Sequence, residues 1–448
     1  KGGPDMRSAR PVRPVQTLPT IRRRICGLVG MGLGGVALAA CDGVGGAPPS
    51  EAGRSYSVTF MTTGNLENTG LQEILDEFKR RNEKVQLEAI TGNEEKLRSL
   101  LAAGTPPDVA RINDNYVFDY ADQQLTQPLD TFLKRSGIRR QDFFELIFDF
   151  GLDQGGKRWA WPMGAAPRLL YVNLDLFRQA GITPPPRQKW DVPGWTMEDF
   201  LDAARRLSKP TDQWGALVFH NTGYEQTWTV NFGHPDGVFS KDGKRFTLAD
   251  PVSVEAMQWV ADLAVRHRVH PDRPTQVQQG ATNLFQQGKV AMLYDGFGAL
   301  GRTRQNAQFE WDVAPLPKKA QRWTVNSLIT YGIPAQAKEP QGGWDILEFC
   351  AGQFAAQVFA RTGYVIPIHR KHAEEITKAG AGQAPKSMHL FPEALGYHTL
   401  PSPRARHVED LRRLYRPKLY DEVNAGKTTA RETLTSVRAA VEALLNKE

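Results

Sequence analysis

Cysteine is scarce in this chain, which has three cysteines, Cys26, Cys41 and Cys350, among 448 residues. Two of them lie in the first 41 residues, and Cys350 stands alone in an apolar stretch whose pattern predicts a helix. One cysteine in the remainder of the chain can form no disulfide there, and it can form no cysteine cluster that would bind a metal. We therefore expect no intrachain disulfide in the mature protein.

Short motifs of common enzyme classes are also missing. The sequence has no phosphate-binding loop, no His-Glu-x-x-His zinc motif and no Gly-x-Ser-x-Gly nucleophile turn. His369 and His372 have the spacing of one helix face, but no cysteine or acidic partner completes a site with them, so we interpret them as surface residues. The sequence thus predicts a protein that is not an enzyme, with no catalytic residue, no cofactor and no metal site.

Long apolar runs are absent as well, and the apolar stretch at residues 25–40 is too short to span a membrane but suits a signal peptide. It ends in Leu38-Ala39-Ala40-Cys41, which resembles the bacterial lipobox, in which the cysteine is acylated and becomes the new N-terminus. Glycine, proline and serine follow, as in a flexible tether. We predict a signal peptide at residues 1–41, a lipid (palmitate) on Cys41 and a tether at residues 42–54.

Surplus positive charge is concentrated in the same leader. The whole chain has a formal net charge of +7, and its first 41 residues hold Lys1 and six arginines but a single acid, Asp5. The remainder of the chain is therefore close to neutral. The basic balance belongs to the leader and does not indicate nucleic-acid binding.

The chain after the leader alternates strand and helix patterns. Residues 55–63, 85–90 and 107–112 have the β-branched and alternating character of strands, and helical patterns lie between them at 71–78 and 94–103. Such alternation predicts an α/β fold with a parallel, doubly wound sheet. Ligands of such sheets bind at loops beyond the carboxyl ends of the strands, which are residues 64–68 and 113–116 here.

The stretch at residues 161–196 carries the most specific pattern. An aromatic-proline pair, Trp161-Pro162, precedes a small-residue bend, then Tyr171-x-Asn173, an Ala180-Gly181 stop, three prolines and a Trp195-Thr196 helix start. This order resembles the first crossing between lobes in family 1 of the extracellular solute-binding proteins of ABC importers, which includes maltose and glycerol-phosphate binders. Phe285-x-x-Gly-Lys-x-Ala-Met and Arg361-Thr-Gly-Tyr-Val-Ile-Pro367 resemble later parts of the same family.

The resemblance covers residues 55–448 and implies a two-lobed type II periplasmic-binding-protein fold with a ligand cleft between the lobes. We place the N-lobe at residues 55–165 plus 325–363 and the C-lobe at residues 166–324 plus 364–448. The crossings between the lobes would lie near 164–168, 324–330 and 363–368.

The resemblance also implies ligand-binding residues. Asp114 occupies the loop where glycerol-phosphate binders have a ligand-bonding Glu. Glu94 stands where the same binders have a Tyr. Tyr364 matches the Tyr of their Thr-Gly-Tyr segment. Arg413, thirteen residues before a glycine, matches their C-terminal Arg, and Phe297 falls in the turn where maltose binders have a stacking Trp.

Aromatic side chains are a second group of candidates, because aromatic rings cover the CH faces of sugars while carboxylates, amides and arginines bond the hydroxyls. Trp195 and Trp228 lie in predicted strand-end loops, and either could instead belong to the core. The chain departs from the family pattern at Ala165-Ala166, at the extra charge of Arg168 and at Val325-Asn326-Ser327, where glycines are usual. The resemblance therefore leaves a neutral and an anionic solute both open.

The sequence as a whole predicts a monomeric solute-binding lipoprotein outside the cytoplasm, in the periplasm or at the cell surface. It would deliver a carbohydrate, polyol or glycerol-phosphate-like solute to the transmembrane subunits of an ABC importer, with no nucleic-acid partner. An extracytoplasmic carbohydrate-active hydrolase and a sensor subunit that presents ligand to a receptor are the alternatives.

Overall fold

A computed structural model describes residues 55–209, 212–220, 223–399 and 405–447. The predicted signal peptide, the acylated Cys41 and the tether lie outside the described residues. The described residues belong to one compact unit, Gly53–Glu448. Its strands are β1 (Tyr56–Thr62), β2 (Val85–Thr91), β3 (Val109–Asn113), β4 (Trp161–Asn173), β5 (Trp214–Leu217), β6 (Val290–Gly296), β7 (Trp311–Ala314), β8 (Thr324–Gly332), β9 (Ile366–Pro367) and β10 (His398–Thr399).

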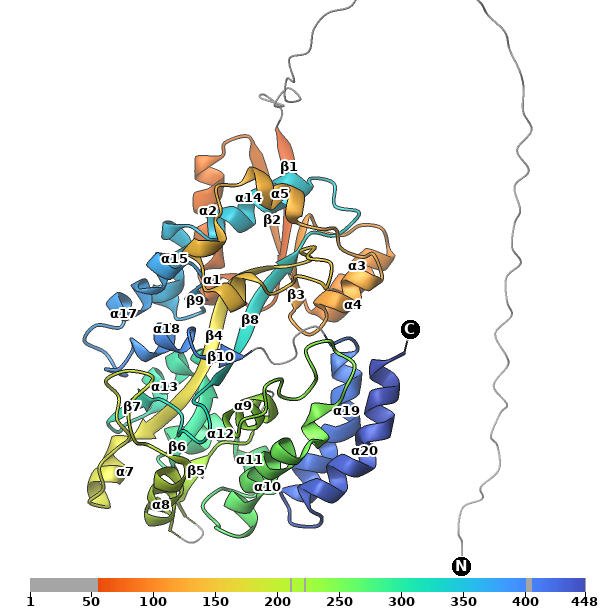
Figure 1. Cartoon of the computed structure of the whole chain (residues 1–448). Coiled ribbons are helices and arrows are strands. Elements are labelled where there is room, and N and C mark those ends of the chain that lie inside the picture. The colour runs from red at the N-terminus through yellow and green to blue at the C-terminus, as the bar shows by residue number, and fades with distance from the viewer. Residues whose placement is uncertain (1–54, 210–211, 221–222, 400–404, 448) are drawn as a thin grey trace, which may run out of the picture. The chain divides into compact units, whose positions relative to one another are not determined.

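Two groups of strands are joined by two long ones. The strand order is β2-β1-β3-β8-β4-β6-β5, with β7 and β9 on β4 and β10 on β8. Strands β1, β2 and β3 pair in parallel at one end, and β5 pairs in parallel with β6 at the other. Strands β4 and β8 run antiparallel to each other and through both groups (Figure 1). We call the part built on β1–β3 the N-lobe and the part built on β5–β7 the C-lobe.

The sheet differs from the parallel arrangement that the strand-helix alternation predicts. Strand β8 pairs antiparallel with β3, and β4 pairs antiparallel with β6. These two strands carry the chain from one lobe to the other, so they are not part of a strand-helix-strand repeat within either lobe. The parallel prediction therefore holds inside each lobe and fails at the crossings.

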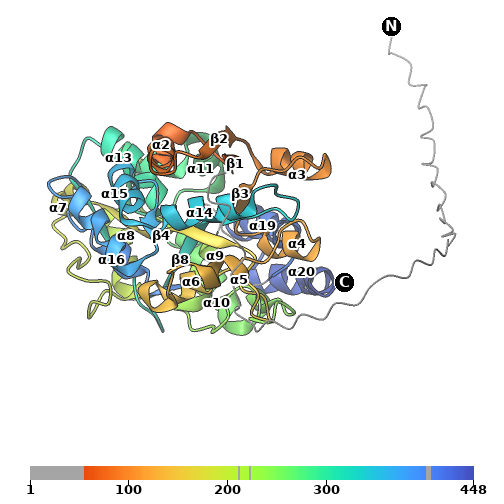
Figure 2. The same cartoon turned by 90° about the horizontal axis from the view of Figure 1, so that it is seen from above.

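Helices cover the N-lobe, and two of them, α2 and α3, begin where the sequence predicts helices. They are α1 (Leu66–Thr69), α2 (Leu71–Arg81), α3 (Glu94–Ala102), α4 (Val117–Asp122), α5 (Asp130–Arg135), α6 (Glu145–Phe148), α14 (Pro340–Cys350), α15 (Gln353–Thr362), α16 (Arg370–Ala373) and α17 (Glu375–Ala379). Helices α14 and α6 lie on opposite sides of β4 and both contact it (Figure 2). The predicted apolar face of α2, from Leu71 to Phe78, is buried.

The C-lobe has its own helices, α7 (Leu174–Gln179), α8 (Met197–Leu207), α9 (Tyr224–Asn231), α10 (Pro251–Val265), α11 (Arg273–Gln279), α12 (Ala281–Gln286), α13 (Leu300–Asn306), α18 (Leu390–Ala394), α19 (Val408–Lys418) and α20 (Ala430–Leu445). Thr196 caps α8, and Asp199 closes the capping box, as the sequence predicts. Helix α10 contacts α9 and α20, and α20 contacts α19.

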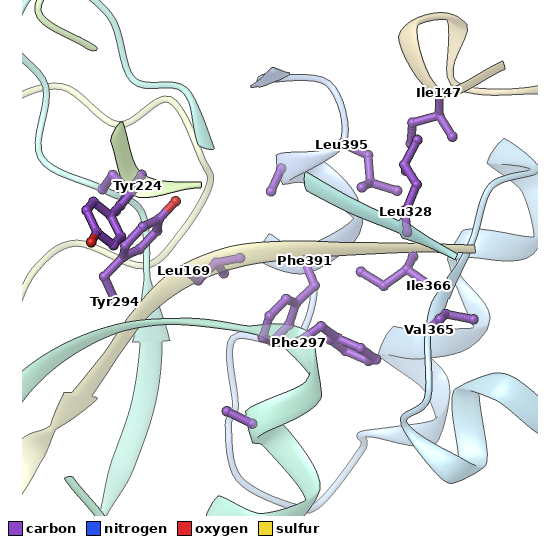
Figure 3. Close-up of a cluster of buried hydrophobic side chains, with 14 of the residues drawn as sticks. Ile147, Leu169, Tyr224, Tyr294, Phe297, Leu328, Val365, Ile366, Phe391 and Leu395 are labelled. Carbon is purple, nitrogen blue, oxygen red and sulfur yellow. The ribbon is translucent and has the colours of Figure 1, made fainter. Parts of the chain in front are cut away.

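Buried apolar side chains are continuous through the crossing strands. Figure 3 draws Leu169 from β4, Leu328 from β8, Ile366 from β9 and Phe391 from α18 in one cluster. Gly164 allows β9 to approach β4 closely, because a Cβ at this position would lie 2.4 Å from Val365 Cγ2. Helices α16 and α17 contact α15 of the N-lobe although they follow residue 363, and the exact lobe boundaries given above stay a prediction.

Candidate functional site

Polar side chains gather where the strands of both lobes end. Strand β3 is followed by Asp114 and Asn115, β6 ends at Asp295-Gly296, and His220 follows β5. These carboxyl ends are where α/β sheets bind their ligands. The sequence predicted this location for residues 113–116, and the structure brings the β3 end against the crossing strand β8.

Asp114 is the N-lobe residue at the centre of this region. Its Oδ2 accepts a hydrogen bond from the backbone N of Leu328 at 3.2 Å. Burial raises the pKa of Asp114, while the hydrogen bond from Leu328 and the positive charges of Arg111 and Arg412 act in the opposite direction. The carboxylate is thus costly to keep charged, and additional donors from a bound solute would stabilise it.

Arg412, and not the predicted Arg413, faces Asp114. The Arg412 side chain is 4% exposed and its Nη1 lies 2.6 Å from Glu409 Oε1, whereas the Arg413 side chain is 77% exposed and bonds Asp410. Glu409 Oε1 also accepts a hydrogen bond of 3.1 Å from Asn115 Nδ2 of the N-lobe. Helix α19 therefore carries contacts from the C-lobe to the end of β3.

A π-turn lies between the two arginines of helix α19 and the glycine from which the family resemblance counts thirteen residues. Leu419–Val423 forms a π-helix between α19 and Gly426. A π-turn closes over one more residue than an α-turn, so it rotates every preceding side chain relative to an uninterrupted α-helix. In this chain the side chain of Arg412 faces inward and that of Arg413 faces solvent.

This difference gives a direct test on two adjacent residues. Arg412→Ala should lower the free energy of unfolding by about 2 kcal/mol, because a buried charge-assisted contact is lost and Asp114 loses a positive neighbour. Arg413→Ala should change it by less than about 0.5 kcal/mol, because exposed ion pairs contribute little. Urea denaturation of both variants measures the two values, and equal losses would contradict this placement.

A second buried ion pair continues the site into the C-lobe. Arg416 Nε lies 2.6 Å from Glu225 Oε1, and the Glu225 side chain is 1% exposed. Burial acts against the charged guanidinium, but the Glu225 carboxylate raises the pKa of Arg416 above its ordinary value. Glu225 is the second residue of helix α9, which starts after Gly223 in a left-handed conformation (φ 96°). We call Arg111, Asp114, Glu225, Arg412 and Arg416 the inter-lobe polar cluster.

Three aromatic candidates lie in the core of the structure instead of facing a solute. Trp228 is fully buried in α9, its Nε1 donates to Val218 O at 3.3 Å, and its ring packs against Trp259 and Tyr294. Phe297 is fully buried, and its ring meets Phe391 at a centroid distance of 4.9 Å beneath β4 (Figure 3).

Trp195 is the third of these aromatic residues. It is 8% exposed, and its Nε1 donates to Pro315 O at 3.1 Å. Its backbone is left-handed (φ 56°), and its carbonyl oxygen accepts a hydrogen bond from Arg322. These contacts fix the residue at the start of α8 as part of the C-lobe core.

Glu94 and Tyr364 are partly exposed residues of the N-lobe. Glu94 accepts a hydrogen bond from the Tyr120 hydroxyl and lies 3.8 Å from Arg98 Nε, and burial raises its pKa. Tyr364 lies beside Phe359, with ring centroids 6.0 Å apart. The positive charge of Arg111, a member of the inter-lobe polar cluster, acts on the pKa of Glu94 against the effect of burial. The role of Glu94 and Tyr364 in solute binding stays a prediction.

The sequence does not indicate that Glu225, Arg412 and Arg416 are buried. A charged side chain in a helical pattern looks the same whether it faces the core or the solvent. Within the described residues, no group of three or more His, Cys, Asp or Glu side chains is placed to hold a metal ion. No described helix has both the length and the apolar character needed to cross a membrane.

Comparison with known proteins identifies the family. The sequence profile of the bacterial extracellular solute-binding proteins matches residues 63–356. This chain belongs to the bacterial extracellular solute-binding protein family. The family resemblance inferred from residues 161–196 is thereby confirmed, and with it a function in binding solutes outside the cytoplasm.

Two curated relatives have about the same sequence identity to this solute-binding protein. A putative binding protein of Brucella abortus (strain 2308) is 24% identical over 292 residues, which cover 62% of this chain and 67% of that protein. The sn-glycerol-3-phosphate-binding periplasmic protein UgpB of Escherichia coli (strain K12) is 24% identical over 306 residues, which cover 64% of this chain and 67% of UgpB.

Solved structures confirm the two-lobed α/β fold. An ABC substrate-binding protein of Listeria monocytogenes, in complex with cycloalternan, has a TM-score of 0.76 at 20% identity and covers 88% of this chain and 99% of its own. The GacH receptor of Streptomyces glaucescens, solved unliganded and with acarbose, has a TM-score of 0.72 at 19% identity. The match covers 87% of this chain and 98% of the GacH chain.

Proposed function

We propose that this solute-binding protein captures a carbohydrate or polyol between its two lobes and delivers it to the transmembrane subunits of an ABC importer. The inter-lobe polar cluster is the observation that carries the proposal. It brings Asp114 of the N-lobe near the positive charge of Arg412 on α19, the C-lobe helix that also carries the buried Arg416–Glu225 pair. Carboxylates and arginines in this position are suited to the hydroxyl groups of a sugar.

The pairing of the charges favours a neutral solute over an anionic one. Arg412 lies 2.6 Å from Glu409, and Arg416 lies 2.6 Å from Glu225. An anion would have to compete with these carboxylates, whereas a hydroxyl group can bond to the pairs as they stand. A glycerol-phosphate-like solute is the second candidate, because UgpB, one of the relatives, is named for binding sn-glycerol 3-phosphate.

A thermal-shift screen tests the proposal. The panel contains tagatose, maltose and maltotetraose with other neutral mono- and oligosaccharides, and sn-glycerol 3-phosphate is its anionic member. A ligand that binds only the native state raises stability by RT ln(1 + [L]/Kd), which is about 2.7 kcal/mol at 100 times Kd. We expect a clear rise in Tm with at least one neutral sugar. A rise with sn-glycerol 3-phosphate alone would establish the second candidate, and no rise with any member would contradict the proposed function.

We further propose that the mature protein is a monomer anchored to the membrane by a lipid on Cys41. The motif Leu38-Ala39-Ala40-Cys41 after a short apolar stretch supports this proposal. Mass spectrometry of the protein extracted from membranes should find Cys41 as an acylated N-terminal residue. Cys41→Ser should release the protein from the membrane fraction. A mature protein that keeps residues 1–40 would contradict the proposal.

A further inference from the structure

Arg111 is the arginine of the inter-lobe polar cluster that has no carboxylate partner. Arg412 and Arg416 each lie 2.6 Å from a carboxylate oxygen. Among the described residues, no ion pair and no side-chain hydrogen bond joins Arg111 to another residue, and its Nε is buried without a hydrogen-bond partner. A guanidinium has five N–H donors, and a buried donor without an acceptor is unfavourable. Arg111 therefore requires an acceptor that the described part of the chain does not supply.

Arg111 lies near the end of β3, where the N-lobe meets the crossing strand β8. It is directly opposite Tyr331 in the antiparallel pairing of these strands, and Asp114 follows three residues later. Arg111, Asp114 and Glu94 are all partly exposed, so none of the three is sealed from solvent in this conformation.

Electrostatic interactions link Arg111 to both carboxyl groups. Burial raises the pKa of Asp114 and the pKa of Glu94, and the positive charge of Arg111 acts on both groups in the opposite direction. On Asp114 its effect exceeds that of Arg412. Because the interaction of two charges weakens with distance, Arg111 lies close to both carboxyl groups. One guanidinium and two carboxyl groups thus share the region beyond the carboxyl ends of β2 and β3.

We propose that Arg111 is a further solute-binding residue, which donates hydrogen bonds to the solute between the carboxylates of Asp114 and Glu94. The inference rests on the proposed function. A hydroxyl group can accept from Arg111 while it donates to a carboxylate, and two carboxylates suit two neighbouring hydroxyl groups. An anionic group would meet two negative charges and one positive charge in the same place. The three residues therefore select a neutral sugar with adjacent hydroxyl groups.

Two substitutions of Arg111 separate solute binding from stability. Arg111→Lys keeps the positive charge beside Asp114 but loses the planar fork of donors, so Tm should stay within about 2 °C of the wild type. Its affinity for the sugar that raises Tm most in the panel should fall about 5-fold. Arg111→Met also loses the charge, and its affinity should fall about 10- to 150-fold. Isothermal titration calorimetry measures both affinities.

Arg98→Lys is the matched control. Arg98 also lies beside Glu94, with its Nε 3.8 Å from Oε1, but its guanidinium already lies over the rings of Tyr116 and Tyr120. This substitution should change the affinity by less than about 2-fold. Equal losses of affinity in Arg98→Lys and Arg111→Lys would overturn the inference. A fall in Tm of more than about 5 °C in Arg111→Lys would overturn it as well, because Arg111 would then be a structural residue.

The same titrations separate this inference from the proposed function. A sugar that binds Asp114→Ala more weakly, but Arg111→Met as tightly as the wild type, would support the function and overturn the role of Arg111. Binding of sn-glycerol 3-phosphate alone would overturn the selection of a neutral sugar. A wild type that binds no member of the panel would contradict both the function and the inference.

Discussion

Replacing Glu225 by glutamine should lower the free energy of unfolding by about 3–5 kcal/mol, because it leaves the buried charge of Arg416 without its carboxylate. The Glu225 side chain is 1% exposed and that of Arg416 is 13% exposed, so little water is present to replace the lost partner. Urea denaturation at constant pH measures the change, and the slope with urea should stay the same.

An exposed ion pair supplies the control. Asp410 and Arg413 lie 2.7 Å apart on α19, with side chains 58% and 77% exposed. Asp410→Asn removes the same kind of charge and should change the free energy of unfolding by less than about 0.5 kcal/mol. A Glu225→Gln variant that loses no more than this control would show that the Glu225–Arg416 pair is solvated in solution.

Trp228→Ala should lower the free energy of unfolding by about 3–5 kcal/mol, because it leaves a large cavity in the C-lobe core. The indole is fully buried between Trp259 and Tyr294. Trp228→Phe fills most of the space and should lose clearly less. Thermal or urea unfolding measures both variants. If Trp228 instead lined the solute site, Trp228→Ala would leave stability nearly unchanged and weaken sugar binding.

The misplacement of Trp228 has a physical cause in helix α9. Every residue of Tyr224–Asn231 is buried, so the helix has no polar face. A helix that is buried on all sides has no 3.6-residue stripe of apolar positions, and mixed polar and aromatic residues then resemble a loop. The sequence therefore predicts α2, which has one solvated face, but not α9.

Resemblance to the family predicts the two lobes, the crossings and the position of Asp114. It does not predict the partners of Asp114, because these come from β8 and α19, far along the chain. Arg412 is missed because nothing in the sequence distinguishes its buried side chain from the exposed side chain of Arg413.

The central claim is that the inter-lobe polar cluster binds the solute, and isothermal titration calorimetry tests it most directly. The sugar that raises Tm most in the panel is titrated into the wild type and into Asp114→Ala. Loss of hydrogen bonds to a charged group predicts an affinity about 10- to 150-fold weaker in the variant. A Kd for Asp114→Ala equal to that of the wild type would contradict the claim.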